Sequence, residues 1–161
     1  MTPEEEIERL YRTHGHSVLR RARHILGDEH EANEVLQELF MSLLDRPGQF
    51  RGESSVTTWL YSVTTHLCLN RLRSQRTRLR LVEERVAPAQ PDEAPARADQ
   101  RALAQQLLAG LPGEVAEAAV YYYCDEMSQE EIAGVLGCSR RHVGDLLERC
   151  RERARAWEAA P

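Results

Sequence analysis

The sequence predicts an all-α protein with two small helical domains joined by a flexible linker, the second domain containing a helix-turn-helix. Apolar residues recur at helical spacing through most of the 161 residues, and no stretch of useful length alternates with the period of a strand. Residues 87–98 lack a helical period and contain three prolines among alanines and acids. We therefore expect domains at 1–86 and 99–161, with the linker at 87–98 between them.

The first predicted helix begins at Pro3 and ends before Gly27. Thr2 and Glu5 have the spacing of a capping box, and proline suits the first helical position. Gly27 suits the left-handed cap that ends many helices, while Gly15 could bend or divide the helix. The apolar positions of this helix are Ile7, Leu10, Tyr11, Val18, Ala22, Ile25 and Leu26.

Two further helices complete the predicted N-terminal domain. Asp28 caps the second helix, which ends at Pro47 and Gly48. Its apolar face consists of Ala32, Val35, Leu36, Leu39, Phe40 and Leu43, and its acidic face of Glu31, Glu34, Glu38 and Asp45. Ser54 or Ser55 caps the third helix, whose apolar stripe is Val56, Leu60, Val63 and Leu67, with Trp59 packed at its edge.

The segment Gln129–Glu148 has the pattern of a helix-turn-helix. Ser128 and Glu131 form a capping box, Gly137 permits the positive φ of a turn, and Ser139 caps the second helix. The residues that close the small core are Ala133, Ile132, Leu136, Val143 and Leu146 or Leu147. An αα-hairpin without DNA contacts would use the same turn. We interpret the preceding tyrosines, Tyr121–Tyr123, as core and rim of this domain.

Composition indicates a cytoplasmic protein without membrane insertion. No apolar run approaches the roughly 20 residues that span a bilayer, and the first residues lack the basic and apolar regions of a signal peptide. The four cysteines, Cys68, Cys124, Cys138 and Cys150, show no paired short spacing. They are therefore predicted to be reduced thiols, not a disulfide framework or a zinc site.

The basic side chains exclude several kinds of enzyme. All 21 of them are arginine, so the chain can build neither a lysine-dependent phosphate loop nor a Schiff base. No clustered nucleophile, base and orienting group is present either. We predict no catalytic residue, no metal site and no cofactor, and hence no enzyme. Arginine must carry any contact with phosphate.

Charge is segregated along the chain, although the net charge is -5. Asp28–Asp45 contains six acids and no arginine, whereas Arg71–Arg80 contains five arginines and no acid. Just before the arginines, His66, Asn70 and Arg73 share one face of the third helix beside its apolar stripe. Polar groups there could read bases, with the arginines on phosphates. A basic helix end exposed to solvent remains the alternative explanation.

These motifs together resemble the extracytoplasmic-function group of sigma factors, the two-domain members of the bacterial sigma-70 family. "LGDEHEANEVLQELFMSLL" (Leu26–Leu44) resembles the helix that binds core polymerase, and "FRGESSVTTWLYSVTTHLCLNRLR" (Phe50–Arg73) resembles the promoter-melting and minus-ten-reading segment. "LPGEVAEAAVYYYCDEMSQEEIAGVLGCSRRHV" (Leu111–Val143) resembles the domain that binds the minus-thirty-five element. The order and spacing of the three motifs cover nearly the whole chain apart from the linker.

The resemblance implies a transcription initiation factor that binds core RNA polymerase and promoter DNA, and it makes an anti-sigma protein a plausible further partner. The implied polymerase contacts are Asn33, Glu34, Gln37, Glu38 and Met41. The implied minus-ten contacts are Phe50, Arg51, Ser54, His66, Asn70, Arg73 and Arg76. The implied minus-thirty-five contacts are Ser139, Arg140, Arg141, His142 and Arg149.

Two departures from the family pattern support an alternative. Gly144 and Asp145 stand where the family usually places basic or polar residues, and aspartate facing phosphate would weaken DNA binding. His66 occupies a position where asparagine is common in the family. The alternative is a degenerate sigma-like adaptor that binds polymerase or an anti-sigma protein but reads the minus-thirty-five element weakly or not at all. An ordinary helix-turn-helix repressor would leave the N-terminal motifs unexplained.

Overall fold

The computed structural model describes residues 2–52, 54–83 and 96–159. Over these ranges the chain forms seven α-helices, a 3-10 turn at Pro47–Gln49 and a π-helical turn at Val120–Cys124, without any strand, so the predicted all-α class is confirmed. None of these helices is long and apolar enough to cross a bilayer. Most of the predicted linker lies outside the described residues, and its end is already helical because α4 begins at Ala96.

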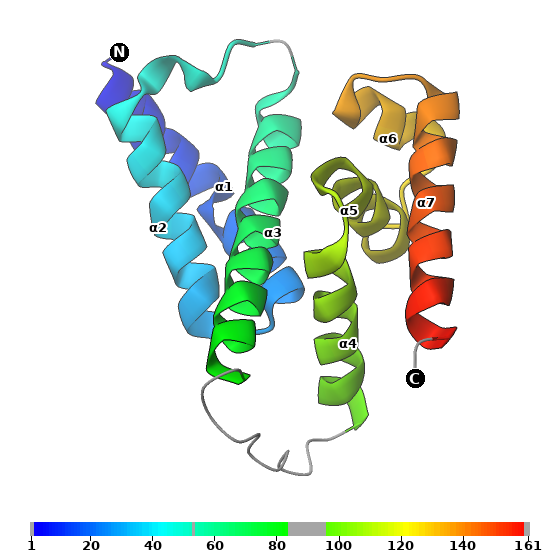
Figure 1. The fold of residues 1–161 in the computed structure, drawn as a ribbon. Coiled ribbons are helices and arrows are strands. Elements are labelled where there is room, and N and C mark those ends of the chain that lie inside the picture. The colour runs from blue at the N-terminus through cyan, green and yellow to red at the C-terminus, as the bar shows by residue number, and fades with distance from the viewer. Residues whose placement is uncertain (1, 53, 84–95, 160–161) are drawn as a thin grey trace. The chain divides into compact units, whose positions relative to one another are not determined.

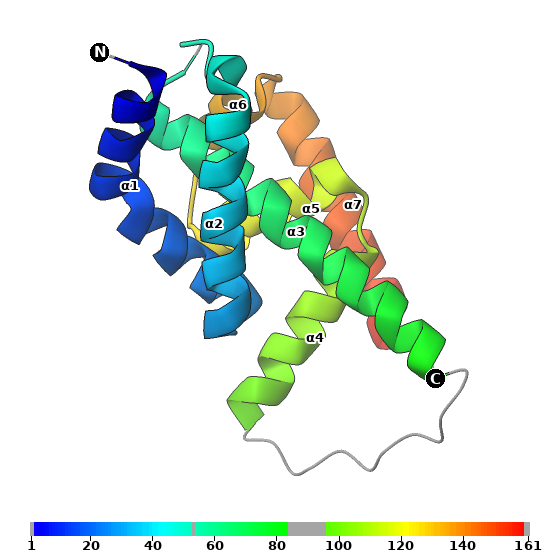
Figure 2. The same ribbon diagram turned by 90° about the vertical axis from the view of Figure 1, so that its left-hand side faces the viewer.

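The chain divides into two compact units, Met1–Cys68 and Leu69–Pro161, and the division lies inside one long helix, α3 (Val56–Glu83). In the first unit, α1 (Pro3–Leu26) and α2 (Glu29–Asp45) form an antiparallel hairpin (Figure 1). The view in Figure 2 shows the same pair side by side. The units are therefore separated within a helix and not only by the linker.

Local chemistry sets the ends of α1 and α2 as predicted. Thr2 and Glu5 form a capping box, and Gly27 ends α1 with a φ of 69°. The carboxylate of Asp28 accepts a hydrogen bond of 2.8 Å from the backbone N–H of Glu31. Gly15 is buried inside a continuous α1, so it does not divide the helix.

The core of the first unit is assembled from all three helices. Leu60 of α3 joins the buried cluster of α1 and α2, whose other members are Ile7, Val18, Leu36, Leu39, Phe40 and Leu43. Val56, Trp59, Val63 and Leu67 pack partly buried against it, as the stripe predicted. Tyr11 differs from prediction, because 50% of this residue is exposed and its ring lies edge-on to Phe40 at 5.1 Å.

The third helix begins with Ser55 as its cap, since the Ser55 hydroxyl accepts a hydrogen bond of 3.1 Å from the backbone N–H of Thr58. Two buried threonines follow at its centre. Their hydroxyls donate to the carbonyls one turn earlier, Thr64 to Leu60 at 2.6 Å and Thr65 to Tyr61 at 2.9 Å. These bonds satisfy the buried hydroxyls within the helix itself.

The second unit contains α4 (Ala96–Gly110), α5 (Gly113–Ala119) and the π-helical turn that follows it. Tyr121 is fully buried, and its hydroxyl donates a hydrogen bond of 2.8 Å to the Glu117 carboxylate. Tyr123 is 53% exposed. The interpretation of these tyrosines as core and rim is confirmed.

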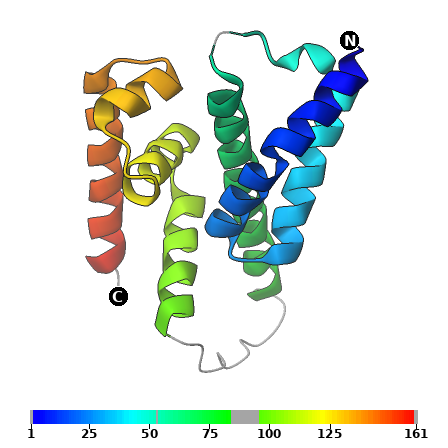
Figure 3. The same ribbon diagram turned by 180° about the vertical axis from the view of Figure 1, so that it is seen from behind.

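Helices α6 (Gln129–Leu136) and α7 (Arg140–Ala159) form the predicted helix-turn-helix, which is visible in Figure 3. Ser128 and Glu131 make the capping box, Gly137 has a φ of 68°, and the Ser139 hydroxyl accepts from the backbone N–H of His142 at 3.1 Å. The core residues that this turn brings together are Ile132, Ala133, Val143, Leu146 and Leu147, all buried.

Candidate polymerase and nucleic-acid interfaces

The predicted polymerase contacts lie on the solvent side of α2, which we call the α2 face and define by Asn33, Glu34, Gln37, Glu38 and Met41. Gln37 and Glu38 are exposed. His30 Nε2 lies 3.0 Å from the Glu34 carboxylate, and the Asn33 amide donates to the Glu29 carbonyl at 2.8 Å. Helical spacing places all five on or beside the side opposite the buried stripe. The face therefore combines acids with polar amides.

Apolar groups extend the α2 face beyond what the sequence predicted. Met41 is 58% exposed and Leu44, one turn further along the same side, is 46% exposed. Large apolar side chains left in water beside acidic groups are typical of a protein contact. Leu44 was missed because the helical period assigned only its neighbour Leu43 to the apolar face, and the period alone does not show that Leu44 stays exposed.

The predicted minus-ten residues come from the loop before α3 and from α3 itself. His66 and Asn70 are exposed, and Arg73 is half-buried with its Nη1 3.5 Å from Asn70 Oδ1. Trp59 lies seven residues before His66, so these side chains follow one line along the helix. The ring of Phe50 packs against Trp59 at 5.7 Å.

The remaining predicted minus-ten residues surround this line. Arg51 and Ser54 are exposed in the loop, and Arg76 is half-buried one turn beyond Arg73. Helical rise puts Trp59 and His66 about 10 Å apart along the axis. One side of α3 thus carries a line of polar side chains, with the aromatic pair Phe50 and Trp59 at its start and the cation Arg76 at its far end.

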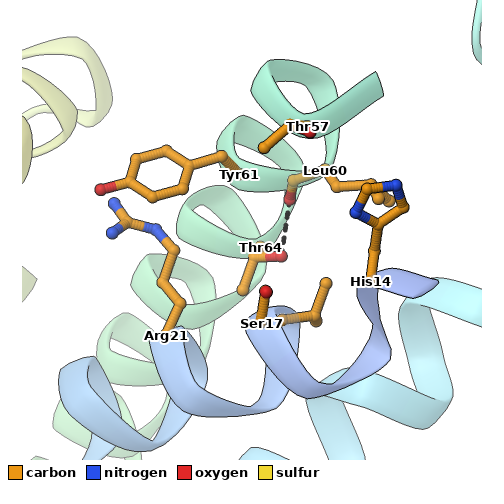
Figure 4. A pocket seen from close by; sticks show the side chains of 8 residues that line it. His14, Ser17, Arg21, Thr57, Leu60, Tyr61 and Thr64 are labelled. Carbon is orange, nitrogen blue, oxygen red and sulfur yellow. Dashed lines mark hydrogen bonds between the residues drawn. The ribbon is translucent and has the colours of Figure 1, made fainter. Parts of the chain in front are cut away.

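Behind this line, α1 and α3 enclose a small pocket of about 40 Å³ that sequence reasoning missed (Figure 4). Arg21 is 8% exposed there, and its Nε donates to Thr65 Oγ1 at 2.9 Å. Its guanidinium carbon lies 3.3 Å from the ring centre of Tyr61. The pocket is lined by His14, Ser17, Val18, Arg21, Thr57, Leu60, Tyr61 and Thr64.

The volume of this pocket is too small for a ligand site, and we interpret the pocket as part of the packing between α1 and α3. The guanidinium of Arg21, which lines the pocket, contacts the Thr65 hydroxyl and the ring of Tyr61, both within the first unit. Across the described ranges, no group of three or more His, Cys, Asp and Glu side chains could hold a metal ion. None of the four cysteines forms a disulfide, and Cys68 and Cys150 are buried.

Four of the predicted minus-thirty-five residues, Ser139, Arg140, Arg141 and His142, lie at the N-terminal end of α7, whereas Arg149 lies near the middle of the helix. Arg140, Arg141 and Arg149 are exposed, and Ser139 serves as the cap of the helix. Arg149 also borders a shallow hollow of about 280 Å³ with Leu111, Pro112, Val115, Glu152, Arg153 and Ala156. A capped helix end that carries exposed guanidinium groups is suited to contact phosphates and base edges.

His142 is the exception among these residues, because it is already engaged. Its Nε2 lies 3.0 Å from the Glu114 carboxylate at the start of α5, and the two side chains are 42% and 53% exposed. This pair could not be predicted from spacing, since the residues lie 28 positions apart. The histidine ring is thereby turned toward α5.

Comparison with known proteins identifies the family of the chain. The model of sigma-70 region 2 matches residues 10–78, and that of sigma-70 region 4 matches residues 101–153. The RNA polymerase sigma factor YlaC of Bacillus subtilis is 30% identical, with 94% of this chain and 91% of that protein covered. The ECF RNA polymerase sigma factor SigE of Mycolicibacterium smegmatis is 31% identical, with 94% of this chain and 61% of that protein covered.

A solved structure shares the fold. CnrH, determined in complex with the cytosolic domain of CnrY, superposes with a TM-score of 0.53 and 22% identity, covering 96% of this chain and 88% of that one. The two matched regions and the two relatives establish that the chain belongs to the extracytoplasmic-function group of the sigma-70 family and is a transcription initiation factor.

Proposed function

We propose that this sigma factor binds core RNA polymerase through the α2 face, holds the opened minus-ten element on α3, and reads the minus-thirty-five element with the N-terminal end of α7. The domains proposed for these tasks are 1–86 and 99–161. The protein acts in the cytoplasm, where core polymerase meets DNA. An anti-sigma protein, such as those that bind other members of the family, is a further proposed partner.

The observation that carries the proposal is the exposure of Met41 and Leu44 within an acidic surface. A DNA-binding repressor has no use for such a surface. Apolar side chains that become buried at an interface supply affinity, and the surrounding acids favour a basic partner. The α2 face therefore fits a factor that acts together with polymerase.

The line of side chains on α3 supports the melting role. A base that leaves the duplex exposes its Watson–Crick edge and an aromatic face, and it must be held to offset a few kcal/mol of unstacking. The exposed His66 and Asn70 present hydrogen-bonding groups, and Phe50 with Trp59 presents an aromatic surface at the start of the line. Arg73 and Arg76 supply positive charge toward the phosphates that follow.

Run-off transcription with core polymerase tests the DNA-reading roles. We expect His66→Ala combined with Asn70→Ala to reduce open-complex formation, and Arg140→Ala combined with Arg141→Ala to reduce initiation about 10- to 100-fold at promoters that need the minus-thirty-five element. Arg153→Ala combined with Arg155→Ala removes the same charge from the other end of α7 and serves as the control. Equal losses in both arginine pairs would contradict the proposal.

Co-elution with core polymerase tests the α2 face. Met41→Asp replaces an exposed apolar side chain of the face by a charge without disturbing the core, and we expect it to weaken binding by about tenfold or more. Leu103→Asp is the matched control, because Leu103 is 50% exposed on α4. If Met41→Asp and wild type bound core polymerase equally well, the α2 face would not be the contact.

A further inference from the structure

The outward side of α7 carries two acids close to its DNA-facing end. Arg141, Asp145, Glu148 and Glu152 follow one another at spacings of three or four residues, so they lie along one side of the helix. The opposite side is buried through Val143, Leu146, Leu147 and Cys150. Asp145 thus lies one turn beyond Arg141 on the exposed side, where the sequence suggested that it would only oppose phosphate.

The two acids nearest the helix start have different surroundings. Glu148 is held by Arg151, whose Nε and Nη2 lie 3.1 and 3.0 Å from its carboxylate, and Arg155 approaches at 3.8 Å. Hydrogen bonds with Tyr123 and then Glu148 raise the pKa of Arg151. Asp145 is exposed, and no residue within the described ranges forms a hydrogen bond or ion pair with its carboxylate. Of these two acids, Asp145 is the one whose carboxylate has no partner among the described residues.

Base chemistry gives an unmatched carboxylate a specific partner in the major groove. A carboxylate can only accept hydrogen bonds, and the exocyclic N4 amine of cytosine is a donor without an acceptor beside it on the same base. Guanine and thymine present acceptors there, and adenine places its N7 acceptor next to its amine. A carboxylate that faced only phosphates would be repelled, whereas the N4 amine of cytosine donates a hydrogen bond to it, so cytosine is the base that this carboxylate prefers.

The spacing to Arg141 fits adjacent readout. Four residues of helix advance about 6 Å, which corresponds to about two base steps along the duplex. The forked guanidinium of arginine matches the O6 and N7 acceptors of guanine. Arg141 is exposed and, within the described ranges, has no ion-pair partner. The two side chains can therefore read neighbouring positions of one element.

We propose that Asp145 is a specificity-determining residue that accepts a hydrogen bond from the N4 amine of a cytosine in the minus-thirty-five element, within about two base steps of a guanine that Arg141 reads. This inference rests on the proposed function of α7. In this role Asp145 is the source of a sequence preference and not a defect in the recognition helix.

The test uses holoenzyme reconstituted with core polymerase and promoters that share one minus-ten element. Each minus-thirty-five position is changed to all four bases, and relative affinities are measured by competition. We expect wild type to prefer cytosine about tenfold at one position. Asp145→Ala should abolish the cytosine preference at that position and leave the preferences at all other positions unchanged. Asp145→Asn should shift the preference toward adenine, whose N6 and N7 suit an amide. Glu152→Gln, which removes a charge further along the same side, should leave every preference unchanged.

Two other outcomes would overturn the inference and are distinguishable from each other. If Asp145→Ala tightened binding to all sequences equally and kept every preference, Asp145 would face phosphate and read no base. If wild type showed no preference at any minus-thirty-five position while changes in the minus-ten element still mattered, the proposed role of α7 would itself fail.

Discussion

Two sets of arginines in this protein show how surroundings decide what one side chain does. Arg21 lies buried between α1 and α3, with Thr65 and the ring of Tyr61 against its guanidinium. Arg140 and Arg141 lie exposed at the start of α7, and within the described ranges no side chain pairs with them. A guanidinium with internal partners contributes to folding, whereas one that faces solvent is available to a ligand.

The largest expected effect comes from replacing Arg21, the buried arginine. Arg21→Ala should lower the free energy of unfolding by about 3 kcal/mol, because it removes a hydrogen bond from a charged group, a cation–π contact and buried packing. Urea unfolding monitored by tryptophan fluorescence in a Trp157→Phe background would report on Trp59 in the first unit.

The control for Arg21 is its neighbour Arg20, which is exposed. Arg20→Ala should change the free energy of unfolding by less than about 0.5 kcal/mol. Similar losses in the two variants would mean that the buried contacts of Arg21 contribute little, and the contrast between the two sets of arginines would disappear.

The second effect concerns the exposed set. Arg141→Ala should reduce holoenzyme affinity for a minus-thirty-five-dependent promoter by about 2 kcal/mol, roughly thirtyfold, because a base contact is lost. The urea midpoint should stay that of wild type, since the side chain is exposed and has no hydrogen-bond or ion-pair partner among the described residues. A variant that lost stability together with affinity would contradict the assignment of Arg141 to DNA.

Helix ends and the turn of α6–α7 could be predicted because short-range chemistry encodes them. Thr2 with Glu5, Ser128 with Glu131, and Gly137 each act within a few residues, and each was predicted from spacing alone. The apolar stripes of α1 and α2 were likewise readable from periodicity. Tyr11 was misplaced because periodicity gives the side of a helix but not how far the neighbouring helix covers it.

Contacts between distant residues could not be predicted from one sequence. The pair of His142 with Glu114 and the contact of Arg21 with Thr65 join different helices. A signal for Arg21 did exist, because it lies three residues after Val18 and four before Ile25, on the apolar side of α1. An arginine on a buried stripe needs internal partners, although the pattern does not say which residues supply them.

The two glycines of the helix-turn-helix extend the comparison to the backbone. Gly137 has a φ of 68°, so Gly137→Ala should destabilise by about 1 kcal/mol. Gly144 lies inside α7, and an added Cβ there would meet only the Gln129 side chain at 3.6 Å, an ordinary contact. Gly144→Ala should therefore stabilise by about 1 kcal/mol, which thermal unfolding can measure. Equal shifts in the same direction would show that the turn does not depend on Gly137.

The smallest expected effect belongs to the pair of His142 and Glu114. In its surroundings this pair is intermediate between Arg21, which is buried, and Arg141, which is exposed and unpaired within the described ranges. Both side chains are about half exposed, so water competes with their contact, and ordering two side chains offsets part of any gain. A double-mutant cycle with His142→Ala and Glu114→Ala should give a coupling energy of about 0.5 kcal/mol or less in unfolding. A coupling energy of about 2 kcal/mol would mean that the pair is a structural contact, as the contacts of Arg21 are. The His142 side chain would then be held against α5 and away from DNA.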